Sequence, residues 1–401
     1  MHRFTYDNAP QRVYWETTSA CDLACRHCRA EASPDRDPAE LTTEEGRRLL
    51  ERLAAFGSPL PHVVLTGGDP LKRDDLFDLV AFARGLGFGV SLAPSATPLL
   101  TEDAIRAIKA AGVDAISLSL DGPDAERHDA IRGVPGTYER TLAAARVARE
   151  VSLPFQVNTL VCEETIDGLP AIHEQVVALG AARWSLFFLV TVGRGHVLRP
   201  ITPERAEQLL EWVAGLARQR MARPGRSGLI ITTTEAPQIR RVVAEQRRST
   251  PMDHPHGAPP AEATGHHPGS STAEATGHHP GAAPAEATGH HPGATTHANH
   301  GAGIRDGNGI LFISNTGEIC PSGFLEVSTG NVRTDDIVDV YRSSPLFREL
   351  REPDGFGGRC GRCEYRFACG GSRARAYSAS GDPLAEDPLC PHEPLPLPLQ
   401  A

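Results

Sequence analysis

Three cysteines lie close together near the start of the chain, in the sequence TSACDLACRHCRAEA over residues 18–32. Cys21, Cys25 and Cys28 form a CxxxCxxC spacing directly after RVYWETT (12–18), an apolar segment that predicts a strand. A disulfide uses two thiols and a closed zinc site uses four ligands. Three thiols therefore indicate a metal group that keeps one coordination position open.

Two kinds of metal group could use these thiols. Zinc would need a fourth ligand such as His27, which lies between Cys25 and Cys28, where a short loop has difficulty placing four ligands tetrahedrally around one ion. An iron-sulfur cube suits the spacing better, because each thiolate binds a different iron. The fourth iron would then remain open to another ligand.

The segment CDLACRHC resembles the cysteine motif of radical S-adenosylmethionine (SAM) enzymes. The resemblance implies that the amino and carboxylate groups of SAM chelate the open iron of a 4Fe-4S cluster. An electron from the cluster would cleave the sulfonium, giving methionine and a 5'-deoxyadenosyl radical that abstracts hydrogen from a substrate.

Other segments that resemble this family follow expected strands, at the end where β-α barrels build their sites. LTGGDP (65–70) resembles the segment that binds the methionine ammonium, with Asp69 as a shorter acid than the usual glutamate. SLDG (119–122) resembles the strand end that approaches the ribose and methionyl groups, and HDAIRG (128–133) supplies an arginine for the carboxylate. A structural alternative exists for each, since GGD is common in turns and a strand-end Ser or Asn often caps a helix. The implied cofactor contacts are Gly67, Gly68, Asp69, Ser119, Asp121, Arg132 and Asn158; no residue is assigned to catalysis on the substrate.

A second group of cysteines near the C-terminus has the spacing of a closed metal site. Cys360, Cys363, Cys369 and Cys390 follow one another as CX2CX5CX20C. A zinc ribbon is one interpretation of four such ligands. Attached to a radical SAM core, the pattern resembles the SPASM extension, which binds auxiliary 4Fe-4S clusters.

The match to the SPASM pattern is partial. Cys320 and Gly330 fit its beginning, but Asp335 and Arg373 stand where it has further cysteines. The resemblance therefore implies two 4Fe-4S clusters, a catalytic one on the first three cysteines and an auxiliary one on the last four. Cys320 is expected to be a spare thiol that faces the substrate region or packs, and Cys162 a buried small apolar side chain.

Repeated β-α units are expected to position these cysteines. From residue 12 to about 236, short apolar segments alternate with amphipathic helices, one of them opening with a capping box between Thr42 and Glu45. The units are too few for a closed barrel of eight. The predicted fold is α/β, a partial (β/α)6 TIM barrel with a small C-terminal iron-sulfur domain, and a doubly wound sheet is the alternative. Expected strands cover 12–18, 62–68, 88–95, 115–122, 154–161 and 183–190.

A histidine-rich repeat separates the two cysteine groups. AEATGHHPG occurs three times with a 12-residue period, in a segment too poor in apolar residues to offset the entropy of ordering it. Its histidine pairs could chelate metal weakly. The predicted domains are a radical SAM partial barrel over 10–245, a disordered insert over 251–303 and a SPASM-like domain over 304–395.

The amino-acid composition limits which classes of partner the protein could bind. With 40 Lys plus Arg against 50 Asp plus Glu, the chain has no basic excess for nucleic acid. Its N-terminus has no signal-peptide pattern, and no apolar run approaches the roughly 18 residues that span a bilayer. We expect a cytoplasmic protein that binds neither nucleic acid nor membrane, and whose cysteines bind metal instead of forming disulfides.

The tail also bears on the substrate. CGGSRARAY followed by SGDPLAEDPLC resembles the heme-pathway branch of these enzymes, which acts on propionate side chains of modified porphyrins. Arg373 and Arg375 could pair such carboxylates, or be solvated helix residues. We therefore predict a tetrapyrrole substrate and a reductase such as flavodoxin or ferredoxin.

Two other functions compete with this one. Maturases of ribosomally made peptides share the architecture, but they often carry an N-terminal peptide-binding domain, and a first strand near residue 12 leaves no room for one. A non-catalytic zinc-binding interaction module is the alternative of another class.

Overall fold

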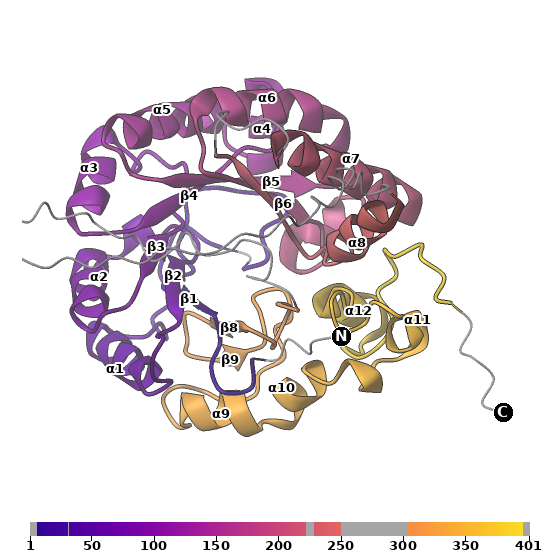
Figure 1. Ribbon diagram of the computed structural model, residues 1–401. Coiled ribbons are helices and arrows are strands. Elements are labelled where there is room, and N and C mark those ends of the chain that lie inside the picture. The colour runs from indigo at the N-terminus through magenta and orange to yellow at the C-terminus, as the bar shows by residue number, and fades with distance from the viewer. Residues whose placement is uncertain (1–5, 31, 222–227, 250–302, 396–401) are drawn as a thin grey trace, which may run out of the picture.

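The computed structural model describes residues 6–30, 32–221, 228–249 and 303–395 (Figure 1). The predicted disordered insert lies outside the described residues except for its last position. None of the described helices is both long and apolar enough to cross a membrane.

A nine-stranded sheet organises the described part of the chain, in the order β7-β6-β5-β4-β3-β2-β1-β8-β9. Neighbouring strands pair in parallel, apart from β8 and β9, which pair antiparallel. The predicted α/β class is confirmed, and each of the six expected strands forms. The strands are β1 Arg12–Glu16, β2 His62–Thr66, β3 Val90–Leu92, β4 Ala115–Ser119, β5 Phe155–Val161, β6 Arg183–Phe188, β7 Ile230–Thr234, β8 Ile310–Ile313 and β9 Ile319–Cys320.

Helices cover the outer side of the curved sheet (Figure 1). The capping box predicted at Thr42 and Glu45 is present and begins α1. The barrel helices are α1 Thr43–Ala54, α2 Leu76–Gly85, α3 Glu102–Ala110, α4 Ala125–Arg132, α5 Thr137–Glu150, α6 Leu169–Leu179, α7 Pro203–Met221 and α8 Ile239–Ser249. The C-terminal helices are α9 Ile337–Ser343, α10 Pro345–Leu350, α11 Gly358–Arg362 and α12 Arg373–Ser380.

The two faces of the sheet differ in chemistry because side chains alternate along a strand. On β4, Ile116 and Leu118 are buried in the main apolar core, whereas Ser117 and Ser119 are half-buried. Ser117 and Ser119 line a cavity on the opposite face, together with polar residues of β2 and β5. The same alternation thus builds the core on one face and a polar site on the other.

The C-terminal region bridges the two edges of the parallel sheet. At one edge β8 pairs with β1, from Arg12 opposite Ile310 onward. At the other edge Gln238, between β7 and α8, donates to the carboxylate of Asp387 at 2.7 Å. Sequence analysis did not predict β7 or β8 as strands. They lie at the two edges where the sheet meets the C-terminal region.

An acidic pair, half-buried Glu235 and buried Asp306, lies at the β7 junction. Glu235 follows β7 with a left-handed backbone, φ 58°, and its carboxylate accepts a hydrogen bond from the hydroxyl of Ser372. Burial and the negative charge of Asp306 raise the pKa of Glu235 well above its usual 4.5. Glu235 therefore keeps a proton in the folded protein at pH values where an exposed glutamate is ionised.

This pair predicts a pH-dependent stability. Above pH 4.5 the unfolded chain releases the proton that folded Glu235 retains, so stability falls as pH rises toward the raised pKa. Glu235→Gln keeps the acceptor for Ser372 and removes the titration. Its melting temperature at pH 8 should exceed that of the parent by roughly 2 °C, and its pH slope should be shallower. Glu211→Gln, on the exposed side of α7, is the control, and an unchanged slope in Glu235→Gln would contradict the assignment.

Candidate functional site

A cavity of about 240 Å³ lies against the polar face of the sheet, at the C-terminal ends of β2 to β6. The loop after β1 contributes Cys21, Cys25 and Cys28 to the lining of this cavity. The other predicted site residues that line it are Gly67, Gly68, Ser119, Asp121, Arg132 and Asn158. The structure thus brings together every predicted barrel site residue except Asp69.

The three thiols of the first group are too far apart to share one zinc ion. Leu23 donates its backbone N–H to the sulfur of Cys21 at 3.4 Å, and Arg132 donates to the sulfur of Cys25 at 3.7 Å. Among the described residues, no three cysteine sulfurs lie within 4.8 Å of one another. Tetrahedral zinc would bring its sulfurs to about 3.8 Å from one another, given Zn–S bonds of about 2.3 Å. Thiols that converge without meeting fit an iron-sulfur cube.

His27 does not complete a zinc site with these thiols. It belongs to no group of three ligand atoms within 4.8 Å among the described residues. Burial and the positive charge of Arg132 lower the pKa of His27 to about 4, so its imidazole is neutral in the cavity wall.

Gly67 and Gly68 hold the β2 loop against the cysteine loop. Gly67 has φ 147°, and a Cβ there would lie 2.3 Å from the carbonyl oxygen of Thr18; at Gly68 it would lie 2.4 Å from that of Ala20. The backbone N–H of Gly68 donates to Thr18 at 2.8 Å, and that of Asp69 donates to Ala20 at 2.7 Å. Only residues without a side chain permit this approach.

Asp69 lies behind the cavity wall. It is fully buried, and its carboxylate accepts hydrogen bonds from the Thr97 hydroxyl at 2.6 Å and the backbone N–H groups of Leu71 and Ser95 at 3.2 and 3.3 Å. Burial raises the pKa of Asp69. The carboxylate orders the loop after β3, and Asp69 is absent from the cavity lining.

Asp121 and Arg132 form a buried ion pair with a 2.5 Å contact. Burial opposes ionisation of Asp121, but Arg132, the two nearby histidines and the backbone N–H of Leu160 together keep the pKa of this carboxyl below its usual range. Asp121 also accepts the backbone N–H of Leu160 at 2.7 Å. Because Arg132 also reaches Cys25, this pair ties the ends of β4 and β5 to the cysteine loop.

Asn158 and Ser119 are neighbours across β4 and β5, which pair in this register. Both point to the polar face and line the cavity, and the amide oxygen of Asn158 accepts a hydrogen bond from Gln156 at 2.6 Å. They offer hydroxyl and amide groups for a polar ligand such as a ribose.

Part of the cavity lining is apolar, and sequence analysis missed the residues that form it. Phe187 and Phe324 approach with ring centroids 6.4 Å apart, joined by Leu189 and Val190. Phe324 comes from the C-terminal region, and no local motif marks it. The adjacent phenylalanines in RWSLFFLV were the one local signal for Phe187. That segment predicts a strand, but it does not tell which of its side chains face the cavity.

Two arginines also line the cavity, and only Arg194 adds net positive charge. Arg194, in the short 3-10 segment Gly193–Val197, donates to the carbonyls of Cys25 and Ala32 at 3.1 and 3.2 Å. Its remaining guanidinium nitrogen, Nη2, has no partner among the described residues. Arg29 is instead neutralised by Glu16 and by a second carboxylate, at 3.0 and 2.7 Å.

The four C-terminal cysteines converge on a second, small cavity of about 20 Å³. Backbone N–H groups donate to the sulfurs of Cys360, Cys363 and Cys369 at 3.3 to 3.5 Å. Burial raises the pKa of Cys369 to about 12 and that of Cys390 to about 11, so deprotonation there requires a metal. Sulfurs that converge and accept N–H donors fit an iron-sulfur cluster.

The two remaining cysteines stand apart from both cavities. Cys320 is buried in β9 opposite Phe312, and burial raises the pKa of Cys320 to about 12. Cys162 packs in a small apolar cluster, as predicted. Neither thiol lines either cavity.

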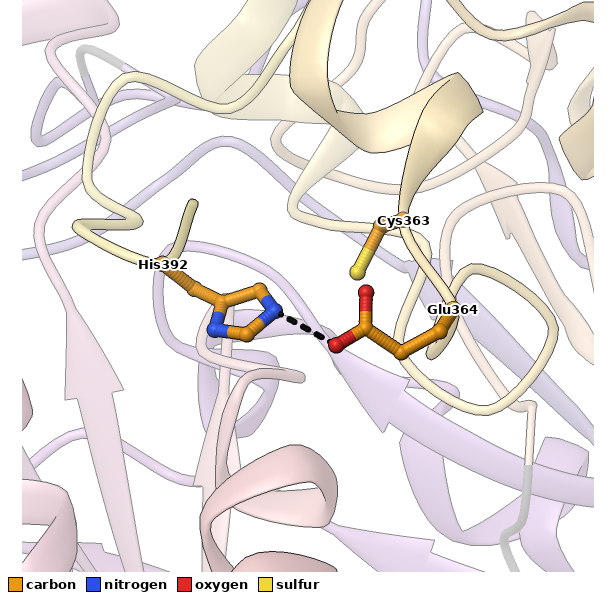
Figure 2. Close-up of side chains that lie close together, drawn as sticks. All are labelled: Cys363, Glu364 and His392. Atoms are coloured by element: carbon orange, nitrogen blue, oxygen red, sulfur yellow. Dashed lines mark hydrogen bonds and ion pairs between the residues drawn. The ribbon is translucent and has the colours of Figure 1, made fainter. Parts of the chain in front are cut away.

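A mixed ligand set adjoins the second cavity. Cys363, Glu364 and His392 are the one group of three potential ligands within 4.8 Å among the described residues (Figure 2). His392 contacts Glu364 at 3.1 Å through Nε2 and Glu245 at 3.7 Å through Nδ1. If the tail bound zinc, this group and not the four cysteines would hold it.

The expectation that Arg373 and Arg375 are free to bind a substrate, or are solvated, is wrong. Arg373 is 0% and Arg375 7% exposed. Arg375 pairs with Asp387 at 3.1 Å, and Arg373 bonds to backbone carbonyls and a sulfur. Neither lines the larger cavity, because α12 turns these side chains into the C-terminal region.

The thiol loop, the glycine pair and the polar sheet face define a radical SAM enzyme, and residues 15–176 match the model of the Radical SAM superfamily. The chain belongs to this superfamily. It is 33% identical over 96% of its length to the AdoMet-dependent heme synthase of Methanosarcina barkeri, and the alignment covers 98% of that protein. It is 30% identical over 94% of its length to the pre-heme d1 synthase of Dinoroseobacter shibae, covering 85% of that protein.

The solved structures agree on the fold. Streptococcus suis SuiB bound to its precursor peptide SuiA matches 96% of this chain and 76% of its own, with a TM-score of 0.66 and 16% identity. Identity this low supports the shared architecture alone.

The glycine contact predicts a local effect on the core site. Gly68→Ala forces a Cβ against the carbonyl of Ala20 and should displace the cysteine loop, so SAM cleavage and iron at Cys21, Cys25 and Cys28 should both fall severely. Gly85→Ala, at the end of α2 with no atom within 4 Å of its Cβ, is the matched control. Iron analysis and 5'-deoxyadenosine assays measure the effect; a Gly68→Ala protein with full iron and activity would refute the packing role.

Proposed function

We propose that this radical SAM enzyme acts on the propionate side chains of a tetrapyrrole. The observation that carries the proposal is the 33% identity to an AdoMet-dependent heme synthase over nearly the whole of both chains. A match of this extent includes the barrel, the C-terminal region and both cysteine groups. We also propose that residues 10–245 form the radical SAM domain and residues 304–395 the auxiliary-cluster domain.

Each cysteine group has a proposed cofactor. We assign the catalytic 4Fe-4S cluster to Cys21, Cys25 and Cys28, and an auxiliary 4Fe-4S cluster to Cys360, Cys363, Cys369 and Cys390. The catalytic cluster, when bound, supplies the electron that cleaves SAM. That electron is proposed to come from a reductase such as flavodoxin or ferredoxin.

The residues of the barrel bind and orient SAM. Ser119 and Asn158 present polar groups from adjacent strands, and backbone groups of Gly67 and Gly68 face the same cavity. Arg132, fixed by Asp121, adds positive charge beside Cys25 for the SAM carboxylate. Asp69 supports this wall from behind through Ser95 and Thr97.

The apolar part of the cavity suits a flat conjugated ring. Phe187 and Phe324 offer aromatic surface, and Leu189 and Val190 exclude water from the site where a radical would form. Arg194 lines the same cavity and supplies positive charge that favours a carboxylated substrate. Aromatic surface beside a cationic side chain matches a carboxylated macrocycle.

A peptide substrate is the second candidate. The similarity in fold to SuiB, a structure holding a precursor peptide, favours it. The 16% identity of that match carries less weight than the 33% identity to the heme synthase. A substrate test must therefore include both classes.

Deuterium transfer tests the substrate. Anaerobic, reduced protein with SAM and an iron porphyrin deuterated on its propionate chains should yield deuterated 5'-deoxyadenosine. Cys25→Ala should abolish its formation, whereas Cys162→Ala, which changes a thiol outside both cavities, should retain it. Mass spectrometry of the nucleoside and the porphyrin measures both products. Deuterium-free nucleoside, with peptide-dependent turnover in its place, would overturn the tetrapyrrole assignment.

Metal content tests the two clusters. Two 4Fe-4S clusters predict about eight irons per chain. Cys390→Ala should lose about four of them and destabilise the C-terminal region, because metal bonds contribute to its folding. Cys320→Ala should lose none.

The zinc alternative gives a different result in the same measurements. About four irons with one zinc, and zinc loss in His392→Ala, would place a mononuclear ion on the group in Figure 2. About twelve irons would mean that a second auxiliary cluster exists, held by a ligand that the cysteine pattern does not reveal.

A further inference from the structure

Arg373 is held against the auxiliary thiol site by contacts on several sides. It is fully buried at the start of α12. Its Nη1 donates to the carbonyls of Pro383 and Ala385 at 3.2 and 2.7 Å, and its Nη2 donates to the sulfur of Cys360 at 3.5 Å. The guanidinium carbon lies 4.4 Å from the centre of the Phe356 ring. These contacts fix the guanidinium plane and aim one edge at the sulfur.

A glycine makes room for this contact. Gly371 has φ 67°, and a Cβ there would lie 2.6 Å from Nη2 of Arg373 and 3.0 Å from the sulfur of Cys360. Any larger residue would intrude between donor and sulfur. The backbone N–H of Gly371 donates to the sulfur of Cys369 at 3.5 Å, so the same turn serves two thiols.

The charge of Arg373 has no carboxylate partner within the described part of the chain. Its neighbour Arg375, by contrast, pairs with Asp387. A buried cation without a counter-ion is costly. The groups in reach that become anionic on metal binding are the thiols of the second cavity, beginning with Cys360.

Other buried arginines reinforce the positive field around this cavity. Arg305 lies 5.4 Å from the same Phe356 ring, and burial, followed by repulsion from Arg373, lowers the pKa of Arg305 to about 9. Arg240 donates to the carbonyl of Ala368, next to Cys369. Metal binding at the thiol site would therefore create an anion inside a positive field.

We propose that Arg373 is a positioning residue that raises the reduction potential of the auxiliary cluster by donating a charged hydrogen bond to the sulfur of Cys360. A four-thiolate cluster becomes more negative by one charge on reduction, and a cation that bonds to a ligand sulfur stabilises the reduced form more than the oxidised form. Arg373 stands where the longer cysteine pattern has a further thiol, so this chain has a cation in place of a ligand. The inference rests on the proposed auxiliary cluster and is independent of the substrate.

A redox titration tests this role. In a Cys25→Ala background, which removes the catalytic cluster, the auxiliary cluster should give the remaining electron paramagnetic resonance signal. Arg373→Met should lower its midpoint potential, and Arg373→Lys, which keeps the charge and loses the planar fork, should restore part of the difference. Arg351→Met removes another buried guanidinium, one that bonds to the carbonyls of Gly307 and Tyr341 and to no sulfur. Its potential should equal that of the parent.

The outcomes separate this inference from the proposal on which it rests. A tail that contains zinc and no iron overturns both. A tail with about four irons whose potential is unchanged in Arg373→Met overturns the role of Arg373 and leaves the cluster assignment intact. If Arg373→Met does not retain its cluster, Arg373→Lys decides: a potential lower than that of the parent supports the inference, and an equal potential refutes it.

Discussion

The close approach of two backbone segments underlies the active site. The loop after β1 carries the three core thiols, and it meets the loop after β2 through hydrogen bonds from Gly68 and Asp69 to Thr18 and Ala20. Because Gly67 and Gly68 have no Cβ, carbonyl oxygens can lie where side chains would otherwise be. The thiols are thereby held at the C-terminal edge of the sheet, where the other strands contribute their polar ends.

Charge pairing connects this loop to the rest of the barrel. Arg132 reaches Cys25 and Asp121, and Arg194 reaches the carbonyls of Cys25 and Ala32. Each of these cations crosses from a later β-α unit to the cysteine loop. Elements distant in the sequence therefore hold a loop that has little regular structure of its own. A cluster site needs such support because its ligands must keep their geometry.

The C-terminal region has two parts in this arrangement. It extends the sheet through β8 and supplies Phe324 to the wall of the larger cavity. It also builds a separate thiol site whose surroundings are rich in buried arginines. Both parts depend on the bridge between the β1 and β7 edges, where Gln238 bonds to Asp387. The same segment therefore shapes the apolar lining of one cavity and the electrostatics of the other.

Local patterns in the sequence were enough to predict the first six strands of the sheet, the capping box at Thr42 and the two groups of cysteines. Strand alternation, helix caps and ligand spacing involve residues close together in the chain. The order of the residues is therefore enough to recognise them. Nine of the ten predicted barrel site residues line the cavity, since the ends of parallel strands meet at one edge.

Tertiary structure decided what depends on distant partners. It turned Asp69 away from the cavity toward Thr97, buried Arg373 and Arg375 inside the C-terminal region, and brought Phe324 to Phe187. A carboxylate or guanidinium has the same local pattern whether it binds a ligand or a neighbouring carbonyl. Its role is set by which chain segment packs against it, because burial without a partner is too costly to persist.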